Sequence, residues 1–171
     1  EQMLSGRHPN SLVRTVDVVA LVLDDQSRFI ELFECYQSTD ELVRLRVSNA
    51  LRRVQAEKPE WLLPLMDRLI DEIAHLDQAS AQWTLPKLFD GAQAAMSARQ
   101  RAAALQIVKR NLAEHDDWIV LNNSMDYLVS RAMADEALRE WLLPHLARLS
   151  QERRKSVARR AQKARVTLGK V

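Results

Sequence analysis

Glu72 and His75 are the residues of this chain whose types and spacing come nearest to a metal-binding motif. In a helix, the Glu-x-x-His spacing places both side chains on one face, and helical di-iron sites use this motif. Those sites also need a second copy of the motif and further glutamates on facing helices. The sequence has no second Glu-x-x-His, so we expect no metal site and no cofactor.

Other sequence features of catalysis are missing as well. The four histidines are scattered, and there is neither a glycine-rich phosphate loop nor a nucleophile motif. The triplet His115-Asp116-Asp117 is better interpreted as the start of a helix. Cys35 lies among apolar residues, where a buried, unreactive thiol is expected. We name no catalytic residue and favour a non-enzymatic role.

Cations are concentrated at the carboxyl end of the chain. Residues 151–171 contain eight lysines and arginines against one acidic residue, which makes this segment +7, whereas the whole chain is only +2. Such a segment attracts phosphate groups, and its candidate binding residues are Arg153, Arg154, Arg159 and Arg160. No aromatic residue lies among them, so stacking on bases is not predicted. The alternative is a terminal helix that closes an acidic body and keeps a polar outer face.

A second group of arginines lies on one predicted helix. Arginine suits bidentate binding of carboxylate or phosphate, so Arg44, Arg46 and Arg52 are candidate binding residues. The alternative is that they pair internally with nearby acidic residues such as Asp40 and Glu41. The sequence leaves both interpretations open.

Residues 59–64 and 139–144 carry nearly the same hexapeptide. The first copy is Pro-Glu-Trp-Leu-Leu-Pro and the second is Arg-Glu-Trp-Leu-Leu-Pro, identical at five of six positions and 80 residues apart. We interpret each copy as the start of the second helix of a pair, with Trp61 and Trp141 as packing anchors. An internal copy of this kind indicates a repeat protein.

The composition favours helices throughout. Hydrophobic residues make up 47% of the chain and glycine occurs only three times. Because β-branched residues never form alternating runs, no sheet is predicted. Apolar residues at helical spacing predict about nine helices, and Pro86 is expected to kink or interrupt one of them. The predicted helices include segments 12–23, 27–37, 41–57, 98–114, 117–133, 135–149 and 151–168.

The spacing also predicts which residues of the first two helices face the core. In the first helix the predicted buried residues are Val16, Val19, Ala20 and Leu23. In the second helix they are Phe29, Ile30, Phe33 and Tyr36.

Aligning the predicted helices with one another gives a period. Residues 43–51 align with 81–89 at an offset of 38, and these align with 120–128 at a further offset of 39. The alternate helices align with Leu62, Met66 and Leu69 on Gln100, Ala104 and Ile107, and again on Leu142, Leu146 and Leu149. A pair of helices at this spacing is typical of HEAT and armadillo arrays.

Residues 40–51, Asp-Glu-Leu-Val-Arg-Leu-Arg-Val-Ser-Asn-Ala-Leu, resemble the first helix of a HEAT-like repeat, in which an aspartate precedes Val-Arg and small and apolar residues follow. The resemblance covers roughly residues 25–168. It implies an all-α, right-handed α-solenoid of about four HEAT-like helix pairs, and usually a protein-binding role without catalytic residues. The copies at 81–89 and 120–128 replace Val-Arg with Ala-Gln and Val-Leu.

We expect one HEAT-like domain over residues 11–171, preceded by a polar lead-in over residues 1–10. Ser11 is the predicted cap of the first helix, and residues 151–171 form the basic terminal helix. The longest uncharged apolar run, Val18 to Leu23, is far shorter than the roughly 20 residues that span a bilayer. The first ten residues also lack the apolar segment of a secretion signal. We therefore expect no membrane association and a cytoplasmic location.

The sequence thus predicts a non-catalytic scaffold that binds a protein or peptide on a concave face. One alternative is a nucleic-acid-binding protein that uses the basic segment 151–171. Another follows from the resemblance, because one HEAT-like class contains DNA-base-excising enzymes with a tryptophan, an aspartate and an arginine on a concave basic surface. Those three residues cannot be placed on this chain.

Overall fold

The computed structural model describes residues 1–5 and 13–169. Within this part the chain is all-α, with nine α-helices, three short 3-10 helices and no strand. Positions 6–10 of the predicted lead-in, the predicted cap Ser11 and the basic residue Lys170 lie outside the described residues. The α-helices are α1 (Val13–Asp24), α2 (Ser27–Glu34), α3 (Glu41–Glu57), α4 (Met66–Asp71), α5 (Ala79–Ala92), α6 (Ala98–Glu114), α7 (Trp118–Ala132), α8 (Glu136–Leu149) and α9 (Lys155–Leu168); the 3-10 helices are Cys35–Gln37, Pro59–Leu65 and Ile73–His75.

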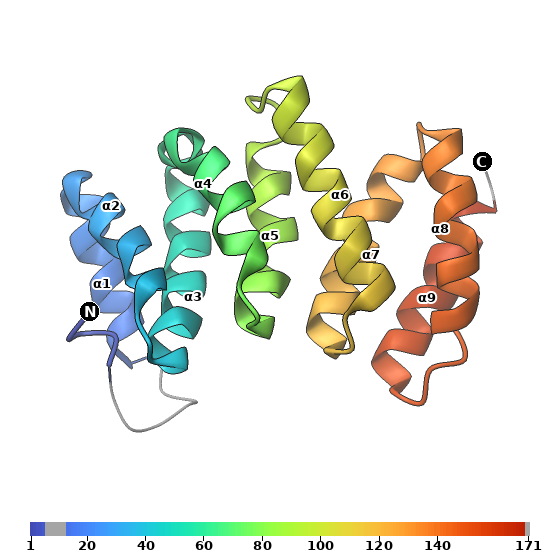
Figure 1. Cartoon of the computed structure of the whole chain (residues 1–171), viewed down its shortest axis with the longest axis horizontal. Coiled ribbons are helices and arrows are strands. Elements are labelled where there is room, and N and C mark those ends of the chain that lie inside the picture. Colours follow the sequence, from blue (N-terminus) through green and yellow to red (C-terminus); the bar gives the residue numbers. More distant parts are fainter. Residues whose placement is uncertain (6–12, 170–171) are drawn as a thin grey trace.

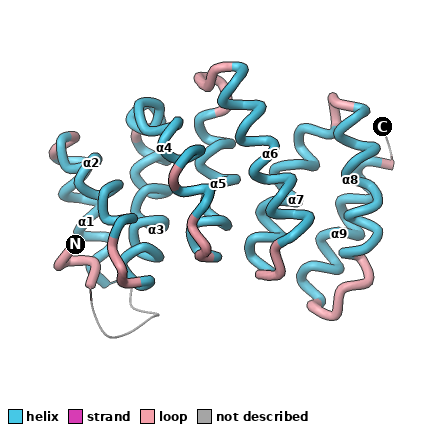
Figure 2. Tube along the Cα trace, in the orientation of Figure 1, coloured by secondary structure: helices cyan, strands magenta, loops and turns pink. Residues whose placement is uncertain are grey.

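The helices follow one another along the longest axis of the molecule, with the two termini at opposite ends (Figure 1). Short loops join them (Figure 2). Each odd-numbered helix packs on the next odd one: α1 on α3, α3 on α5, α5 on α7 and α7 on α9. Even-numbered helices pack on their odd neighbours, as α6 does on α7 and α8 on α9. Contacts between helices therefore link segments that are close in chain order.

Side-chain caps explain where several helices begin. Asp40 accepts a hydrogen bond from the amide of Leu42 at 2.8 Å, and Asp135 accepts one from Leu138 at 2.9 Å. Asp117 caps α7 by accepting from two backbone amides. Each cap satisfies amides that the first helical turn leaves without a partner. The helix starts predicted at Asp40 and Asp117 are confirmed.

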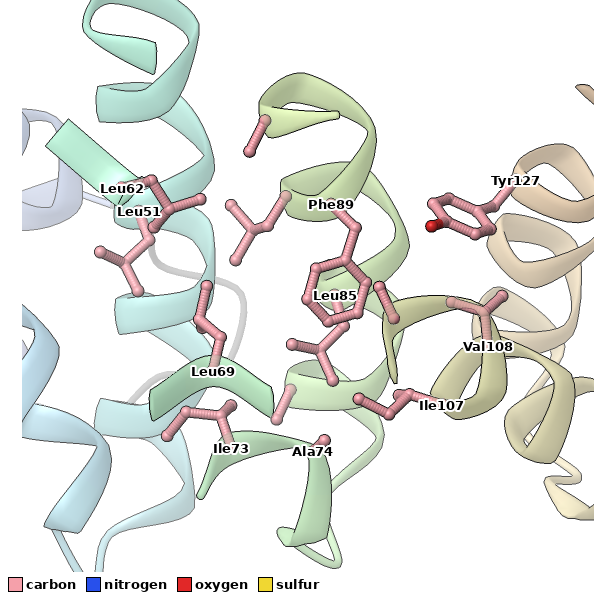
Figure 3. Close-up of a cluster of buried hydrophobic side chains, with 14 of the residues drawn as sticks. Leu51, Leu62, Leu69, Ile73, Ala74, Leu85, Phe89, Ile107, Val108 and Tyr127 are labelled. Carbon is pink, nitrogen blue, oxygen red and sulfur yellow. The ribbon is translucent and has the colours of Figure 1, made fainter. Parts of the chain in front are cut away.

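The buried positions of α3, α5 and α7 recur at the predicted offsets. Figure 3 shows Leu51, Leu85 and Phe89 among the side chains that fill the space between the helices. The buried sets are Val43, Val47, Ala50 and Leu51 in α3; Ala81, Leu85, Leu88 and Phe89 in α5; and Val120, Ser124, Tyr127 and Leu128 in α7. One helical spacing thus places the same face of three helices inward.

The even-numbered segments show the same regularity. Most of their aligned apolar residues are buried, which supports the predicted correspondence of positions. The buried residues include Leu62, Met66, Leu69, Ala104, Ile107, Leu142, Leu146 and Leu149. Ile70, which the same alignment places on the buried Val108, is only half-buried.

The predicted inward faces of α1 and α2 are partly wrong. Val16 and Ile30 are each 55% exposed, and Ala20 is exposed as well. In α1 the buried residues include Val18 and Val22 instead. Apolar residues surround much of α1, so periodicity alone could not decide which stripe faces α3.

Of the kink or interruption expected at Pro86, the interruption is wrong, because α5 continues through this residue to Ala92. Proline removes one helical hydrogen bond and costs about 3 kcal/mol in a helix interior. Here Leu85, Leu88 and Phe89 are fully buried on either side of it. Burial of this face offsets the local cost, since most helical stability in proteins comes from tertiary packing.

The two hexapeptide copies adopt different backbones. Residues Pro59–Leu65 form a 3-10 helix that leads into α4, whereas Trp141 and Pro144 lie well inside α8. The prediction that both copies start a helix is therefore wrong for the second one. In that copy Asp135 already caps the helix upstream, whereas the first copy begins with Pro59, which cannot donate to a preceding turn.

The first residues of the chain contact the helices. Leu4 is buried, and its carbonyl oxygen accepts a hydrogen bond from Arg46 of α3. Ser38, at the start of the loop before α3, donates to the carboxylate of Glu1 at 2.6 Å. Residues 1–5 of the predicted polar lead-in therefore lie against the body of the protein.

Candidate functional site

The candidate arginines of α3 do not form one surface. Arg44 is half-buried and donates to the Ser38 carbonyl at 2.5 Å and to the Gln78 side chain. Arg46 is only 5% exposed and donates to Leu4. Arg52 alone is exposed and has no hydrogen-bond or ion-pair partner among the described residues. Arg44 thus bonds to a carbonyl and an amide, not to the acidic residues Asp40 and Glu41 that the sequence suggested.

The basic carboxyl end is partly tied to the preceding helices. Arg154 donates to the carbonyl oxygen of Asp116 and, at 2.9 Å, to the carboxylate of Glu152. This hydrogen bond lowers the pKa of Glu152 and raises the pKa of Arg154. Arg160 of α9 forms an ion pair with Asp126 of α7. Arg160 therefore joins α9 to α7, and Arg154 joins the segment before α9 to the segment before α7.

An open groove of about 580 Å³ runs between α7 and α9. Its apolar lining comes from both helices: Met125 and Ala164 are buried, and Val129 is half-buried. Met133, just after α7, is 40% exposed at the edge. On the α9 side the apolar lining is the small residue Ala164, and on the α7 side Val129 remains partly uncovered.

Charged side chains form one wall of the same groove. Arg159, Arg160 and Lys163 line it against a single carboxylate, Asp126. Arg159 and Lys163 are exposed, and the charged group of neither side chain has a hydrogen-bond or ion-pair partner among the residues that the structure describes. Asp126 is already shared, since it pairs with Arg160 and lies 4.0 Å from Lys87 of α5. The described lining therefore has three cations for one anion.

This arrangement suits binding. The described lining contains no histidine, cysteine or tyrosine, and its one carboxylate is paired. A groove with an apolar floor and a cationic wall can retain an acidic ligand that also has an apolar part.

The four tryptophans do not form a row. Trp61 is half-buried and packs edge-on against Phe29, with ring centroids 6.0 Å apart. Trp141 is half-buried, with the ammonium of Lys109 4.3 Å from its ring centroid. Trp83 is half-buried, whereas Trp118 is 48% exposed at the start of α7. Trp118 therefore lies outside the core.

His145 lies beside Trp141, with ring centroids 4.2 Å apart. Burial lowers the pKa of His145, and the positive charges of Arg148 and Lys109 lower it further. The imidazole is thus held in its neutral form, packed against an aromatic ring and facing cations. These contacts indicate that His145 has a packing role and does not donate protons in a reaction.

The carboxylate of Glu72 forms an ion pair with an arginine. Arg68 donates to Glu72 at 2.7 Å and to Glu34 at 2.5 Å, and it lies 4.7 Å from the ring centroid of Phe33. The hydrogen bonds from Arg68 lower the pKa of both glutamates. Among the described residues, no group of three or more histidine, cysteine or acidic side chains could hold a metal ion.

Sequence reasoning identified the cations of the groove but missed its apolar floor. Arg159 and Arg160 were candidates, and Lys163 belongs to the same basic segment. The apolar residues Met125, Val129 and Met133 are spaced four apart, so they share one side of α7 and its carboxyl end. This spacing was the sequence feature from which the apolar floor could have been predicted.

Comparison with protein-family models, with curated proteins and with solved structures gives no match. The structure adds one observation on membranes: none of the helices in residues 1–5 and 13–169 combines the length and hydropathy needed to cross a bilayer.

Proposed function

We propose that this chain is a non-catalytic binding scaffold, a right-handed α-solenoid of about four HEAT-like helix pairs that binds a protein or peptide. The recurrence of buried positions through α3, α5 and α7 supports equivalent packing of successive pairs. The contacts of each odd-numbered helix with the next support a stack in which neighbours stabilise one another.

A repeated arginine contact between pairs supports the same proposal. Arg110 donates to the carbonyl oxygen of Ala74 at 2.6 Å, and Arg148 donates to that of Leu112 at 3.2 Å. Both contacts span 36 residues. Arg110 of α6 reaches back to the 3-10 helix that follows α4, and Arg148 of α8 reaches back to α6. The recurrence of one backbone contact at one separation is expected when helix pairs stack with similar geometry.

The odd-numbered helices are the better candidates for the inner side of a curved stack. All four consecutive odd pairs pack closely, whereas close packing between consecutive even helices is confined to α4 and α6 in the described residues. Elements on the inside of a curve lie closer together than those on the outside. We therefore place the binding surface on the odd layer; the sequence alone had favoured the outer face of the even helices together with the arginines at the repeat start.

The observation that carries the proposal is the groove between α7 and α9. It combines an apolar floor with cations that no described residue neutralises, as expected for a surface that binds a partner. The test is capture of proteins from the source organism after nuclease treatment, followed by calorimetric titration of each purified candidate. We expect at least one protein to bind directly at physiological salt. Absence of any direct protein binding would refute the proposal.

A second candidate function is nucleic-acid binding through α9. Its supporting observation is that Arg153, Lys155, Arg159, Lys163 and Arg165 are all exposed. Affinity for an oligonucleotide should then fall steeply with salt, because each phosphate contact releases a counterion. It should also be lost when Arg153, Arg154, Arg159 and Arg160 are neutralised. If neither duplex nor single-stranded DNA binds at low salt, this candidate and the base-excising alternative both fail.

A further inference from the structure

We infer that the groove between α7 and α9 binds an acidic peptide segment that also carries an apolar side chain. This inference rests on the proposed scaffold function and names the chemistry of its partner. It assigns separate roles to the two sides of the groove: the cations receive the carboxylates, and the apolar floor receives the side chain.

The cationic wall of the groove can bind an anion of another molecule. Arg159 and Lys163 are four positions apart on α9, so their side chains are neighbours on one face of the helix. Both are exposed, and no described residue pairs with either one. Arg160, in contrast, is held by Asp126. Two cations in the groove are therefore free to bind carboxylates, while the third holds the wall in place.

The floor favours an apolar side chain beside those carboxylates. Met125 and Ala164 are buried at its base, and Val129 lies half-buried between the helices. Met133 adds exposed apolar surface at the edge. Methionine adapts its shape to different partners, and covering apolar area is the main favourable term in association. Met125 and Ala164 are already covered by the protein itself, so the apolar surface open to a ligand comes from Val129 and Met133, and an entirely polar ligand would leave it uncovered.

Nucleic acid fits the same groove less well. The described lining has no aromatic side chain on which a base could stack. The Asp126 carboxylate lies among the cations and would repel a phosphate backbone that followed the groove. A peptide can place its few carboxylates at Arg159 and Lys163 and avoid Asp126, so we argue for the peptide.

Three fluorescein-labelled synthetic peptides of equal length test the inference by polarisation on the unmodified protein. The first alternates glutamate pairs with leucine, the second has serine in place of leucine, and the third has lysine in place of glutamate. We expect the first to bind at least about tenfold more tightly than either of the others. Equal affinity of the first two would overturn the role of the floor and with it the inference.

Variants then locate the binding. R159E/K163E reverses the charge of the two unpaired groove cations, and it should lower the affinity for the glutamate–leucine peptide by at least about tenfold. R153E/K155E changes the net charge by the same amount at exposed positions outside the groove lining, and it should have little effect. Thermal melting of both variants checks that they fold. Equal losses in both would indicate non-specific attraction, and no loss in R159E/K163E would place the peptide elsewhere; each result overturns the inference.

The result with natural partners separates this inference from the scaffold proposal. If a captured protein binds the unmodified chain and R159E/K163E equally, the groove inference fails and the scaffold stands. If a labelled oligonucleotide outcompetes every peptide and no protein binds, both fail. The supporting result is a partner whose affinity falls in R159E/K163E and is retained in R153E/K155E.

Discussion

The Nδ2 atom of Asn111 donates to the Oε1 atom of Gln82 at 3.0 Å, and both side chains are buried. The amide of Gln82 in turn donates to the carbonyl oxygen of Leu76 at 2.7 Å, where the segment after α4 ends. Asn111 on α6 thus orients a side chain on α5 that satisfies backbone carbonyls of the preceding pair. This polar chain joins three successive segments inside the protein.

Asn111→Leu should destabilise the protein by about 1–3 kcal/mol, because the Gln82 oxygen then stays buried without a donor. Chemical denaturation measures the free energy of unfolding. Gln106→Leu is a matched control on the exposed side of α6 and should change stability by less than about 0.5 kcal/mol. Equal stability of Asn111→Leu and the unmodified chain would show that the polar chain contributes nothing.

Gly91→Ala should also destabilise the protein, despite adding a better helix former. A Cβ atom at Gly91 would lie 2.8 Å from Nε2 of Gln55, which donates to the carbonyl oxygen of Leu88 at 2.7 Å. Displacing this amide costs about 1 kcal/mol through the lost buried hydrogen bond. In a Gln55→Ala background the clash is absent, so Gly91→Ala should be neutral or slightly stabilising. A double-mutant cycle without coupling would contradict this explanation.

His145 should reduce stability in mild acid. Burial, with Arg148 and Lys109 nearby, lowers its pKa in the folded protein below the ordinary value of 6.5. As pH falls below about 6.5, the unfolded chain binds a proton more readily than the folded one, so the free energy of unfolding decreases. His145→Gln should lose this component between about pH 7.5 and pH 5. An NMR titration that gave His145 a pKa above 6.5 would reverse the predicted sign.

Tyr36 should resist ionisation in alkaline solution. Burial raises its pKa, although its hydroxyl is paired with Ser48 at 2.9 Å. Burial also raises the pKa of Tyr127, the only other tyrosine of the chain. The contribution of neutral Tyr36 to the free energy of unfolding is complete below about pH 10. It decreases above that pH, because tyrosine in the unfolded chain ionises first. Ultraviolet difference absorbance should show little tyrosinate before unfolding, and Tyr36→Phe should leave only the Tyr127 signal.

Local chemistry made much of the fold predictable. Asp40 and Asp117 cap helices whose starts could be recognised in the sequence, because a cap needs only a short side chain next to its own amides. The offsets of 38 and 39 residues predicted which positions are buried in α3, α5 and α7, since one helical period recurs in all three. These features depend on residues within one or two turns of each other.

Competing local signals were decided by packing. Pro86 lies inside a continuous helix because its neighbours are buried on the faces that contact α3 and α7. The two hexapeptide copies differ because Asp135 starts one helix upstream of its copy, while Pro59 begins the other. Val16 and Val18 could each have faced inward until contact with α3 selected Val18.

By itself, the sequence determined an all-helical chain, its principal helix boundaries, its repeated apolar positions and the cationic carboxyl end. Only the tertiary structure decided that Arg44 and Arg46 bond internally while Arg159 and Lys163 remain exposed beside Met125 and Val129. The physical reason is distance along the chain. Helix caps and periods arise within a few residues, whereas a groove requires two helices to meet, and their relative position depends on every side chain packed between them.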